Sequence, residues 1–380
     1  MNRRASQIIQ SEIRAMSIEC DRVGGLNLAQ GICDTGVPES IREAAKAGID
    51  GGINSYTRYD GLDNLRRAIA HKMRTFNRIE ADPESEIIVG GGSTGSFYCA
   101  LMSLLNPGDE VVVFEPYYGY HVNTLLAAEL VPVYIRLHPP DWTFEVEELE
   151  RVLTPRTKAL VVNTPANPTG KVFTLPELQS LARIARERDL IVLTDEIYEY
   201  FVFDGRTHLS PAALPEIADR TVTISGFSKV FSITGWRIGY SICRADWAQW
   251  IGYWNDLVYV CAPAPLQHGV AEGIHRLGPD YFAGLCRSYE EKRNRICRAL
   301  DAAGLKPYVP QGAYYVLADA SVLPGRTSKE KTMALLGATG VAGVPADAFF
   351  HDPNESPIIR FCFAKKEDEL EEACRRLERL

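Results

Sequence analysis

The sequence lacks the patterns that would place it in a membrane, outside the cell or on nucleic acid. No apolar run approaches the roughly 18–20 residues that a membrane-spanning helix needs. The start, MNRRASQIIQSEIRAM, has basic residues but no apolar stretch after them, so we do not expect a secretory signal. The formal net charge of −8 argues against a general nucleic-acid binder, which needs a surface rich in lysine and arginine.

Patterns typical of disulfide frameworks and metal sites are also missing. The nine cysteines are scattered without a C-x-x-C pair, and the seven histidines contain no H-E-x-x-H. An odd number of scattered cysteines favours reduced thiols over a disulfide scaffold or a structural zinc site. We therefore expect a cytoplasmic protein that holds no metal.

The sequence does contain a regular alternation of strand-like and helical segments. Between about residues 85 and 240, apolar runs such as EIIVG, EVVVF, KALVV and LIVLTDE alternate with helical stretches. Such nearly continuous apolar runs are typical of strands that are buried on both faces. The alternation predicts an α/β fold with a mostly parallel sheet between helices.

After about residue 244 the pattern changes to longer helices, one near residues 281–303, and a few strands such as AYYVLADA and PIIRFCFA. This change predicts a large domain over residues 43–283. Residues 1–42 with residues 284–380 would form a smaller α+β domain. At its start we expect an amphipathic helix, with these residues on one face: Ile8, Ile9, Ile13 and Met16.

A glycine-rich segment, GGGSTG at residues 90–95, follows a predicted strand and precedes a predicted helix. It matches the G-x-G-x-x-G pattern of dinucleotide-binding folds, so a nicotinamide dehydrogenase is one reading. Dinucleotide fingerprints usually sit on the first strand of their domain, however, and about 85 residues precede this one. The broader interpretation is a phosphate site made by backbone N–H groups and the hydroxyls of Ser93 and Thr94, with a structural turn as the alternative.

Two further segments place polar residues at strand ends, where ligands bind in open α/β sheets. In NTPANPTG, two X-Pro steps and a glycine predict a rigid turn that can hold Asn167 as a hydrogen-bond donor. Asp195 ends the strand LIVLTD, and a carboxylate there is costly unless a cation or a strong donor meets it. Asp195 is thus a candidate partner for a protonated ring nitrogen, with the Tyr198 hydroxyl nearby.

The block SGFSKVFSITGWRIG surrounds Lys229 with small and hydroxyl-bearing residues. Desolvation and nearby cations would lower the pKa of this lysine and make it a nucleophile toward an aldehyde. Eight residues later, Arg237 offers a guanidinium fork that suits a phosphate. With this block after N-P-T-G and D-E-x-Y, the chain resembles the class I/II aminotransferases of pyridoxal-5′-phosphate (PLP) fold type I, which carry these motifs in the same order and spacing. The resemblance extends over nearly the whole chain.

The resemblance implies roles for the residues around the cofactor. Lys229 would form the Schiff base of PLP and then move the proton during amino-group transfer. Asp195 would keep the ring nitrogen protonated. Tyr198 and Asn167 would donate hydrogen bonds to the ring oxygen.

The resemblance also implies a phosphate site and an aromatic contact to the cofactor ring. Gly92, Ser93, Thr94 and Arg237 would hold the phosphate. Tyr118, in FEPYYGY, falls where the family places an aromatic side chain against the ring, with plain packing as the alternative.

For the substrate, the resemblance implies that Arg360 binds the α-carboxylate bidentately, with Asn167 and the backbone of Gly31 as further contacts. Tyr56 aligns with a tyrosine that reaches the phosphate of the neighbouring subunit. The resemblance thus implies a homodimer with a shared active site.

One position departs from the family pattern. The family commonly has a serine three positions before the lysine, where this chain has Gly226. Ser225 or Ser228 could compensate, and the expected effect is weaker retention of the cofactor rather than a different reaction.

Several strings, among them QGICD and FEPYYGY, are most similar to the branch that contains kynurenine, glutamine–phenylpyruvate and methionine aminotransferases. That likeness implies aromatic and unbranched neutral substrates. Thr94 stands where an aspartate-preferring pattern carries lysine, which disfavours aspartate. Aspartate aminotransferase and PLP-dependent C–S β-lyase stay open as alternatives. Cys33, Asp34 and Tyr59 are expected to line the side-chain pocket.

Overall fold

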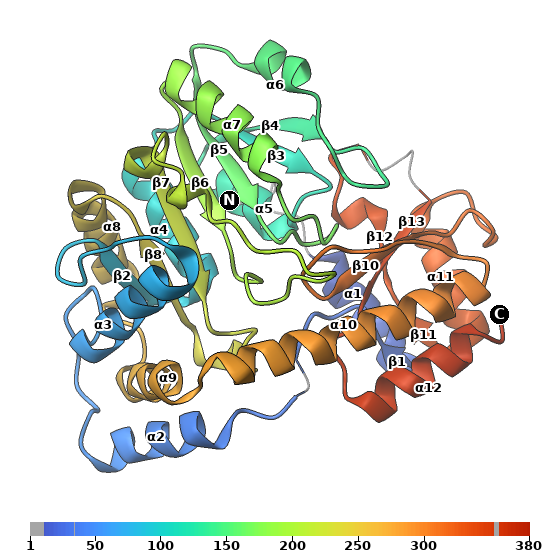
Figure 1. The fold of residues 1–380 in the computed structure, drawn as a ribbon. Helices are drawn as coiled ribbons and strands as arrows, with labels where there is room; N and C mark the ends of the chain where they lie inside the picture. Colours follow the sequence, from blue (N-terminus) through green and yellow to red (C-terminus); the bar gives the residue numbers. More distant parts are fainter. Residues whose placement is uncertain (1–10, 34, 353–356) are drawn as a thin grey trace, which may run out of the picture.

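The computed structural model describes residues 11–33, 35–352 and 357–380, and it confirms the predicted α/β architecture. Figure 1 shows a larger body built on a seven-stranded sheet beside a smaller body built on a four-stranded sheet. The predictions for Ile8, Ile9 and Asp34 lie outside the described residues. Within the described ranges, no helix is both long and apolar enough to cross a membrane.

The large sheet has the strand order β2-β8-β7-β6-β5-β3-β4. Its strands are β2 (Ile87–Gly91), β3 (Glu110–Glu115), β4 (Val131–Arg136), β5 (Thr157–Asn163), β6 (Ile191–Asp195), β7 (Thr221–Gly226) and β8 (Ile238–Ile242). The run from β4 to β7 is parallel as predicted, whereas β8 lies antiparallel to both of its neighbours. The sequence pattern does not predict β8, because Gly239 and Ser241 interrupt its apolar residues.

Helices cover both faces of the large sheet, which explains the apolar runs in the sequence. On β3, Val111 and Val113 pack toward one layer of helices, while Val112 and Phe114 pack toward the other. The first layer consists of α4 (Gly92–Leu104), α5 (Gly119–Ala127) and α8 (Ala245–Tyr259), and the second of α6 (Val146–Val152) and α7 (Leu175–Glu187). Each β3 face is therefore buried, as expected for a parallel sheet.

The remaining helices of the larger body lie beyond the β2 edge. They are α2 (Glu39–Asp50), α3 (Asp63–Lys72) with a π-helical turn (Met73–Asn77), and α9 (Ala264–Arg276). Contacts join α9 to both α2 and α3. The long helix α10 (Pro279–Ala302) runs from α9 to the smaller body along one side of the molecule (Figure 1).

The smaller body is formed by the first and the last segments of the described chain. Its antiparallel sheet has the order β12-β13-β10-β9. The elements are α1 (Glu12–Arg22), β1 (Leu26–Asn27), β9 (Lys306–Tyr308), β10 (Tyr315–Asp319), α11 (Ser328–Thr339), β11 (Val341–Ala342), β12 (Val344–Pro345), β13 (Ile358–Cys362) and α12 (Glu367–Leu377). Strand β1 pairs with β11. The predicted domain boundaries stay a prediction, and α2 and α10 run across them.

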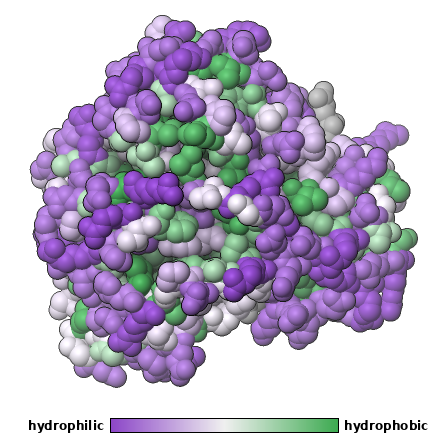
Figure 2. Space-filling view, in the orientation of Figure 1, coloured by the Kyte–Doolittle hydropathy of each residue, from purple (hydrophilic) through white to green (hydrophobic). Residues whose placement is uncertain are grey.

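The face of the molecule in Figure 2 is mostly hydrophilic, and its apolar side chains form scattered patches. All nine cysteines are free thiols, and seven of them are buried. Residues at the carboxyl ends of β5, β6 and β7 line a common cavity with residues of the smaller body.

Candidate active site

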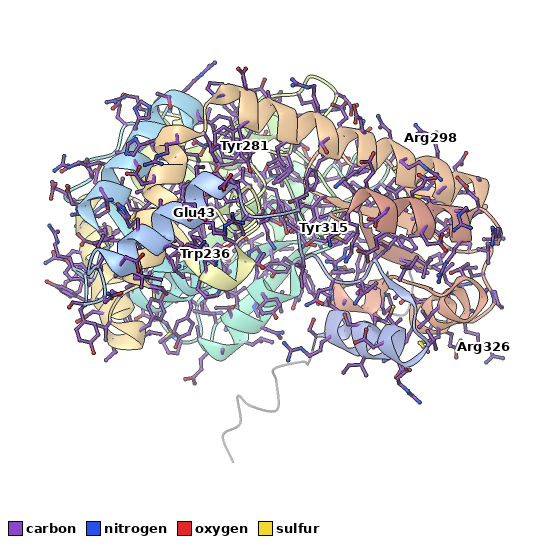
Figure 3. The ribbon with its side chains drawn as sticks, turned by 90° about the horizontal axis from the view of Figure 1, so that it is seen from below. Glu43, Trp236, Tyr281, Arg298, Tyr315 and Arg326 are labelled. Carbon is purple, nitrogen blue, oxygen red and sulfur yellow. The ribbon has the colours of Figure 1, made fainter. Side chains whose placement is uncertain are left out.

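The cavity between the two bodies has a volume of about 420 Å³. In Figure 3, Tyr315, one of its lining residues, lies in the middle of the molecule where the two bodies meet. The cavity brings together ten of the predicted site residues: Gly31, Ser93, Thr94, Tyr118, Asn167, Asp195, Tyr198, Lys229, Arg237 and Arg360.

Lys229 lies in the turn that follows β7, and its amine points into the cavity. Its Nζ donates a hydrogen bond of 3.3 Å to the carbonyl of Gly31 and lies 5.9 Å and 5.7 Å from the ring centres of Tyr198 and Tyr314. Burial lowers the pKa of Lys229, and this effect outweighs the opposing influence of Cys33, Cys362 and Asp195. A larger fraction of the amine is therefore neutral and nucleophilic than in a hydrated lysine.

Asp195 ends β6, is only 7% exposed and meets a partner that the sequence did not reveal. His121 Nε2, from α5, lies 2.8 Å from Asp195 Oδ2. The imidazole is held between Phe97, at 4.8 Å between ring centres, and Tyr118, at 5.2 Å. One carboxylate oxygen is thus fixed by His121, and the backbone N–H of Ile197 lies 3.3 Å from the other.

The residues that were predicted to hold a phosphate come together where the first turn of α4 meets Arg237. Arg237 Nη1 donates to the carbonyl of Thr234 at 2.8 Å, and Nη2 donates to that of Gly91 at 3.3 Å. A Cβ at Gly92 would lie 2.3 Å from Arg237 Nη2, and φ there is +81°, so only glycine allows this approach. The first N–H groups of a helix lack partners within it, and with a guanidinium beside them they form an anion site.

The structure distinguishes the two serines that could compensate for Gly226. Ser225 is fully buried and donates to Glu199 Oε1 at 2.9 Å, away from the cavity, whereas Ser228 lines the cavity. At Gly226 a Cβ would lie 3.0 Å from both Gly239 Cα and the carbonyl oxygen of Ile238. There is little room for a serine side chain at this position.

Arg360, on β13, is completely buried at the base of the cavity. Its Nη1 donates to Asn167 Oδ1 at 2.9 Å and its Nη2 to the carbonyl of Ala29 at 2.7 Å. The guanidinium lies 4.3 Å from the ring centre of Tyr315, and its Nε has no hydrogen-bond partner among the described residues. A buried, oriented guanidinium with an unused donor suits a carboxylate ligand.

Tyr315 is a second cavity residue that the sequence did not reveal. Its hydroxyl lies 3.0 Å from that of Tyr198. A Cβ at Gly31 would lie only 1.9 Å from the Tyr315 hydroxyl oxygen, so the glycine is needed for this contact. The AYYVLADA run indicated a strand, but nothing in it indicated which tyrosine faces the cavity.

Four predicted residues do not line the cavity of their own chain, and one of them, Gly92, lies directly beside Arg237. Tyr56 is 82% exposed and lies outside it. Cys33 is buried and donates to the carbonyl of Lys229 at 3.3 Å, and the ring of Tyr59 packs edge-on against Tyr253. The prediction that Cys33 and Tyr59 line the side-chain pocket is therefore wrong for this cavity. Its rim is lined instead by these residues: Ser11, Ile13, Arg14, Gln30, Ile32 and Tyr120.

Comparison with known proteins identifies this architecture. Residues 23–377 match the family described as aminotransferase class I and II. Mouse kynurenine–oxoglutarate transaminase 3 is 35% identical over 378 residues, which cover 92% of this chain and 83% of the relative. The structure of N-succinyldiaminopimelate aminotransferase from Mycobacterium tuberculosis matches with a TM-score of 0.96 and 34% identity, over 100% of this chain and 99% of the other.

The structure of Escherichia coli YbdL, described with a methionine aminotransferase function, also matches with a TM-score of 0.96, at 29% identity. It covers 100% of this chain and 99% of its own. These agreements extend over nearly the whole length of each protein and confirm fold type I. The chain belongs to the class I and II aminotransferases, the enzymes that transfer amino groups to 2-oxo acids.

Proposed function

We propose that this aminotransferase binds PLP through Lys229 and moves the amino group of a neutral L-amino acid to a 2-oxo acid. The donors would be aromatic amino acids, methionine, glutamine or kynurenine-like compounds. One observation carries the proposal: a single cavity collects a desolvated lysine, a buried carboxylate and a buried arginine with an unused donor.

The residues of the cavity fit this cofactor. Arg237 and the first turn of α4, including Ser93 and Thr94, would hold the phosphate, since Gly92 leaves room for the guanidinium beside the helix. Asp195, fixed by His121, would hold the proton on the ring nitrogen. The remaining ring contacts would come from Tyr118, Tyr198 and Asn167. When bound, PLP supplies the aldehyde that receives the amino group and a ring that withdraws electrons from the substrate Cα.

The protein's own groups position the substrate and move its proton. Arg360 would bind the α-carboxylate, because its guanidinium is already oriented by Asn167 and Ala29. The amine of Lys229, whose pKa is lowered by burial, would accept the proton from the substrate Cα and return it to the cofactor side. The backbone of Gly31 and the ring of Tyr315 would close the opposite side of the carboxylate site.

The residues at the rim of the cavity favour substrates with neutral side chains. Ile13, Ile32 and Tyr120 give it apolar and aromatic surface beside Tyr118. Kynurenine and methionine, which the names or descriptions of two of these relatives contain, carry side chains of this kind. We therefore favour such donors over aspartate, which would bring a second charge close to the apolar rim.

We also propose a homodimer, located in the cytoplasm. Tyr56 is 82% exposed and available to a partner's phosphate site. Helix α8 exposes Trp250, Tyr253 and Leu257, with Leu257 75% exposed, and exposed apolar groups of this kind are typical of protein interfaces. Nine free cysteines are consistent with a reducing compartment.

A half-reaction without acceptor tests the proposed function. The holoenzyme is mixed with phenylalanine, methionine, glutamine, kynurenine or aspartate, and the visible absorbance of the cofactor is followed over a single turnover. We expect conversion to the amino form of the cofactor with the neutral amino acids, and no conversion in the Lys229→Ala variant. Lys306→Ala, which changes an exposed lysine on β9, serves as the matched control.

Two outcomes would contradict this proposal. Release of pyruvate and thiol from a cystathionine-like substrate, without the absorbance change, would indicate a C–S β-lyase. Fast conversion with aspartate and little with the neutral amino acids would indicate an aspartate aminotransferase.

A further inference from the structure

We propose that a second cavity, apart from the active site, binds an aromatic carboxylate with its ring inside and its charge at the mouth. The cavity has a volume of about 750 Å³, which is in the range of small-molecule sites. Its lining residues come mainly from α3 and the π-helical turn, the loop after β6, the end of α9 and the start of α10. Among the described residues, none lines both this cavity and the active site, so the proposed function gives it no role.

Three stacked aromatic rings form one wall of the cavity. Tyr200 lies between Phe76 and Phe282, with 4.3 Å between ring centres on each side. Tyr281, the neighbour of Phe282, marks this end of α10 in Figure 3. The other apolar lining residues are Val202, Phe227, Ile274, Leu277, Pro279 and Ala283. Aromatic walls of this kind favour a flat ring as the occupant.

A buried ion pair in the lining is satisfied within the protein. Lys72 Nζ lies 2.6 Å from Glu199 Oε1, and both side chains are buried. Glu199 also accepts hydrogen bonds from Ser225 at 2.9 Å and from Asn77 at 2.8 Å. Glu199 is the single acid among the described lining residues. Because its charge is matched by Lys72, it does not oppose the entry of an anion.

The exposed part of the lining carries cationic and titratable groups. Arg206 Nη1 donates to Asp204 at 2.9 Å, and the other guanidinium N–H groups have no partner among the described residues. Asp204 does not line the cavity, and Arg293 binds both of its oxygens at 2.7 Å. His71 and His275 are exposed lining residues. A carboxylate at the mouth would therefore meet free donors.

His208 adds an unpaired polar atom to the lining. Its side chain is 2% exposed, and its Nε2 lies 2.7 Å from Glu196 Oε2. An Nε2–H that donates to this carboxylate leaves Nδ1 as an acceptor. Nδ1 has no hydrogen-bond partner among the described residues, although buried polar atoms normally have one. A hydroxyl or N–H on the ligand's ring would provide that partner.

The cavity is open to a ligand in the proposed homodimer. Neither Tyr56 nor any residue of α8 is among its described lining residues. It is nevertheless close to the active site, because Phe227 lines this cavity and the next residue, Ser228, lines the other.

Photolabelling of the holoenzyme locates the ligand directly. The probe is 4-(4-hydroxybenzoyl)benzoate, an aromatic carboxylate with a hydroxyl at its far end, and trypsin digestion with mass spectrometry identifies the labelled peptide. We expect saturable labelling of residues 277–287, a tryptic peptide with six lining residues and none from the active site. Ala283→Trp should abolish this labelling by filling the cavity from an exposed position. Ala302→Trp is the matched control, at an exposed position on α10 outside the cavity.

Competition at the same peptide tests the chemistry of the ligand. Half-protecting concentrations are measured for 6-hydroxy-2-naphthoate, for its amide and for 2-naphthoate. The amide should protect less well than the acid, and loss of the hydroxyl should weaken protection about 2- to 10-fold. Arg206→Gln, at an exposed residue, should weaken the acid about 2- to 5-fold and leave the amide unchanged.

Three results would overturn this inference. The first is labelling confined to active-site peptides, and the second is equal labelling of residues 277–287 in Ala283→Trp and Ala302→Trp. The third is equal protection by the acid and the amide, which would contradict a carboxylate ligand. The labelling does not depend on amino-group transfer, so its outcome is independent of the proposed function.

Discussion

Substituting Gly31 by alanine should damage the carboxylate site from the opposite side of the cavity. The added Cβ would lie 1.9 Å from the Tyr315 hydroxyl oxygen and 2.8 Å from the next ring carbon, far inside van der Waals contact. The tyrosine ring must therefore move by more than an ångström. That movement disturbs the hydroxyl contact to Tyr198 and the stacking on Arg360.

Overpacking of this kind costs about 1–3 kcal/mol, from which alanine recovers about 0.4–1 kcal/mol by restricting the unfolded chain. We expect a net loss of about 1–2 kcal/mol in the free energy of unfolding, measured by urea denaturation at fixed protein concentration. Displacement of Arg360 should raise KM for the amino acid about 10-fold, because hydrogen bonds to charged groups contribute roughly 1.5–3 kcal/mol.

The double variant Gly31→Ala with Tyr315→Phe provides the control. The second substitution removes the atom that the new Cβ meets first, so part of both losses should be recovered, with a coupling of about 0.5–3 kcal/mol. A Gly31→Ala enzyme with unchanged stability and unchanged KM would refute this account of the contact. An absence of coupling between the two substitutions would refute it equally.

Three further predictions concern the cofactor side of the cavity. His121→Phe should lower kcat about 10- to 100-fold in steady-state assays by releasing the Asp195 carboxylate, and an unchanged kcat would contradict this role. Ser228→Ala should weaken cofactor retention in dialysis more than Ser225→Ala does, because only Ser228 lines the cavity. The reverse order would contradict Ser228 as the compensating serine. Burial lowers the pKa of Lys229, so the rate at which the apoenzyme binds PLP covalently should rise with pH through a midpoint below the 10.5 of an ordinary lysine. A midpoint at or above that value would contradict a desolvated amine.

The sequence was sufficient for the residues that lie at strand ends within recognisable segments. Asn167 and Lys229 follow buried strands and Asp195 ends one, and parallel strands bring their carboxyl ends to one edge. Their convergence in one cavity therefore follows from the alternation of strands and helices together with local turn chemistry.

The sequence was insufficient where a contact depends on the tertiary path of the chain. His121 is 74 residues from Asp195, on α5, and no motif in the sequence connects the two. Tyr315 comes from β10 of the smaller body and lies beside Gly31 at the cavity. The choice between Ser225 and Ser228 likewise required the structure, since it depends on which hydroxyl faces Glu199.

The central claim, that Lys229 holds the cofactor, has a direct chemical test. The holoenzyme is reduced with borohydride, which fixes PLP to the lysine that binds it, and is then digested and analysed by mass spectrometry. We predict the added mass on the peptide that contains Lys229. The same mass on a peptide with another lysine, such as Lys171 or Lys331, or on none, would contradict the account.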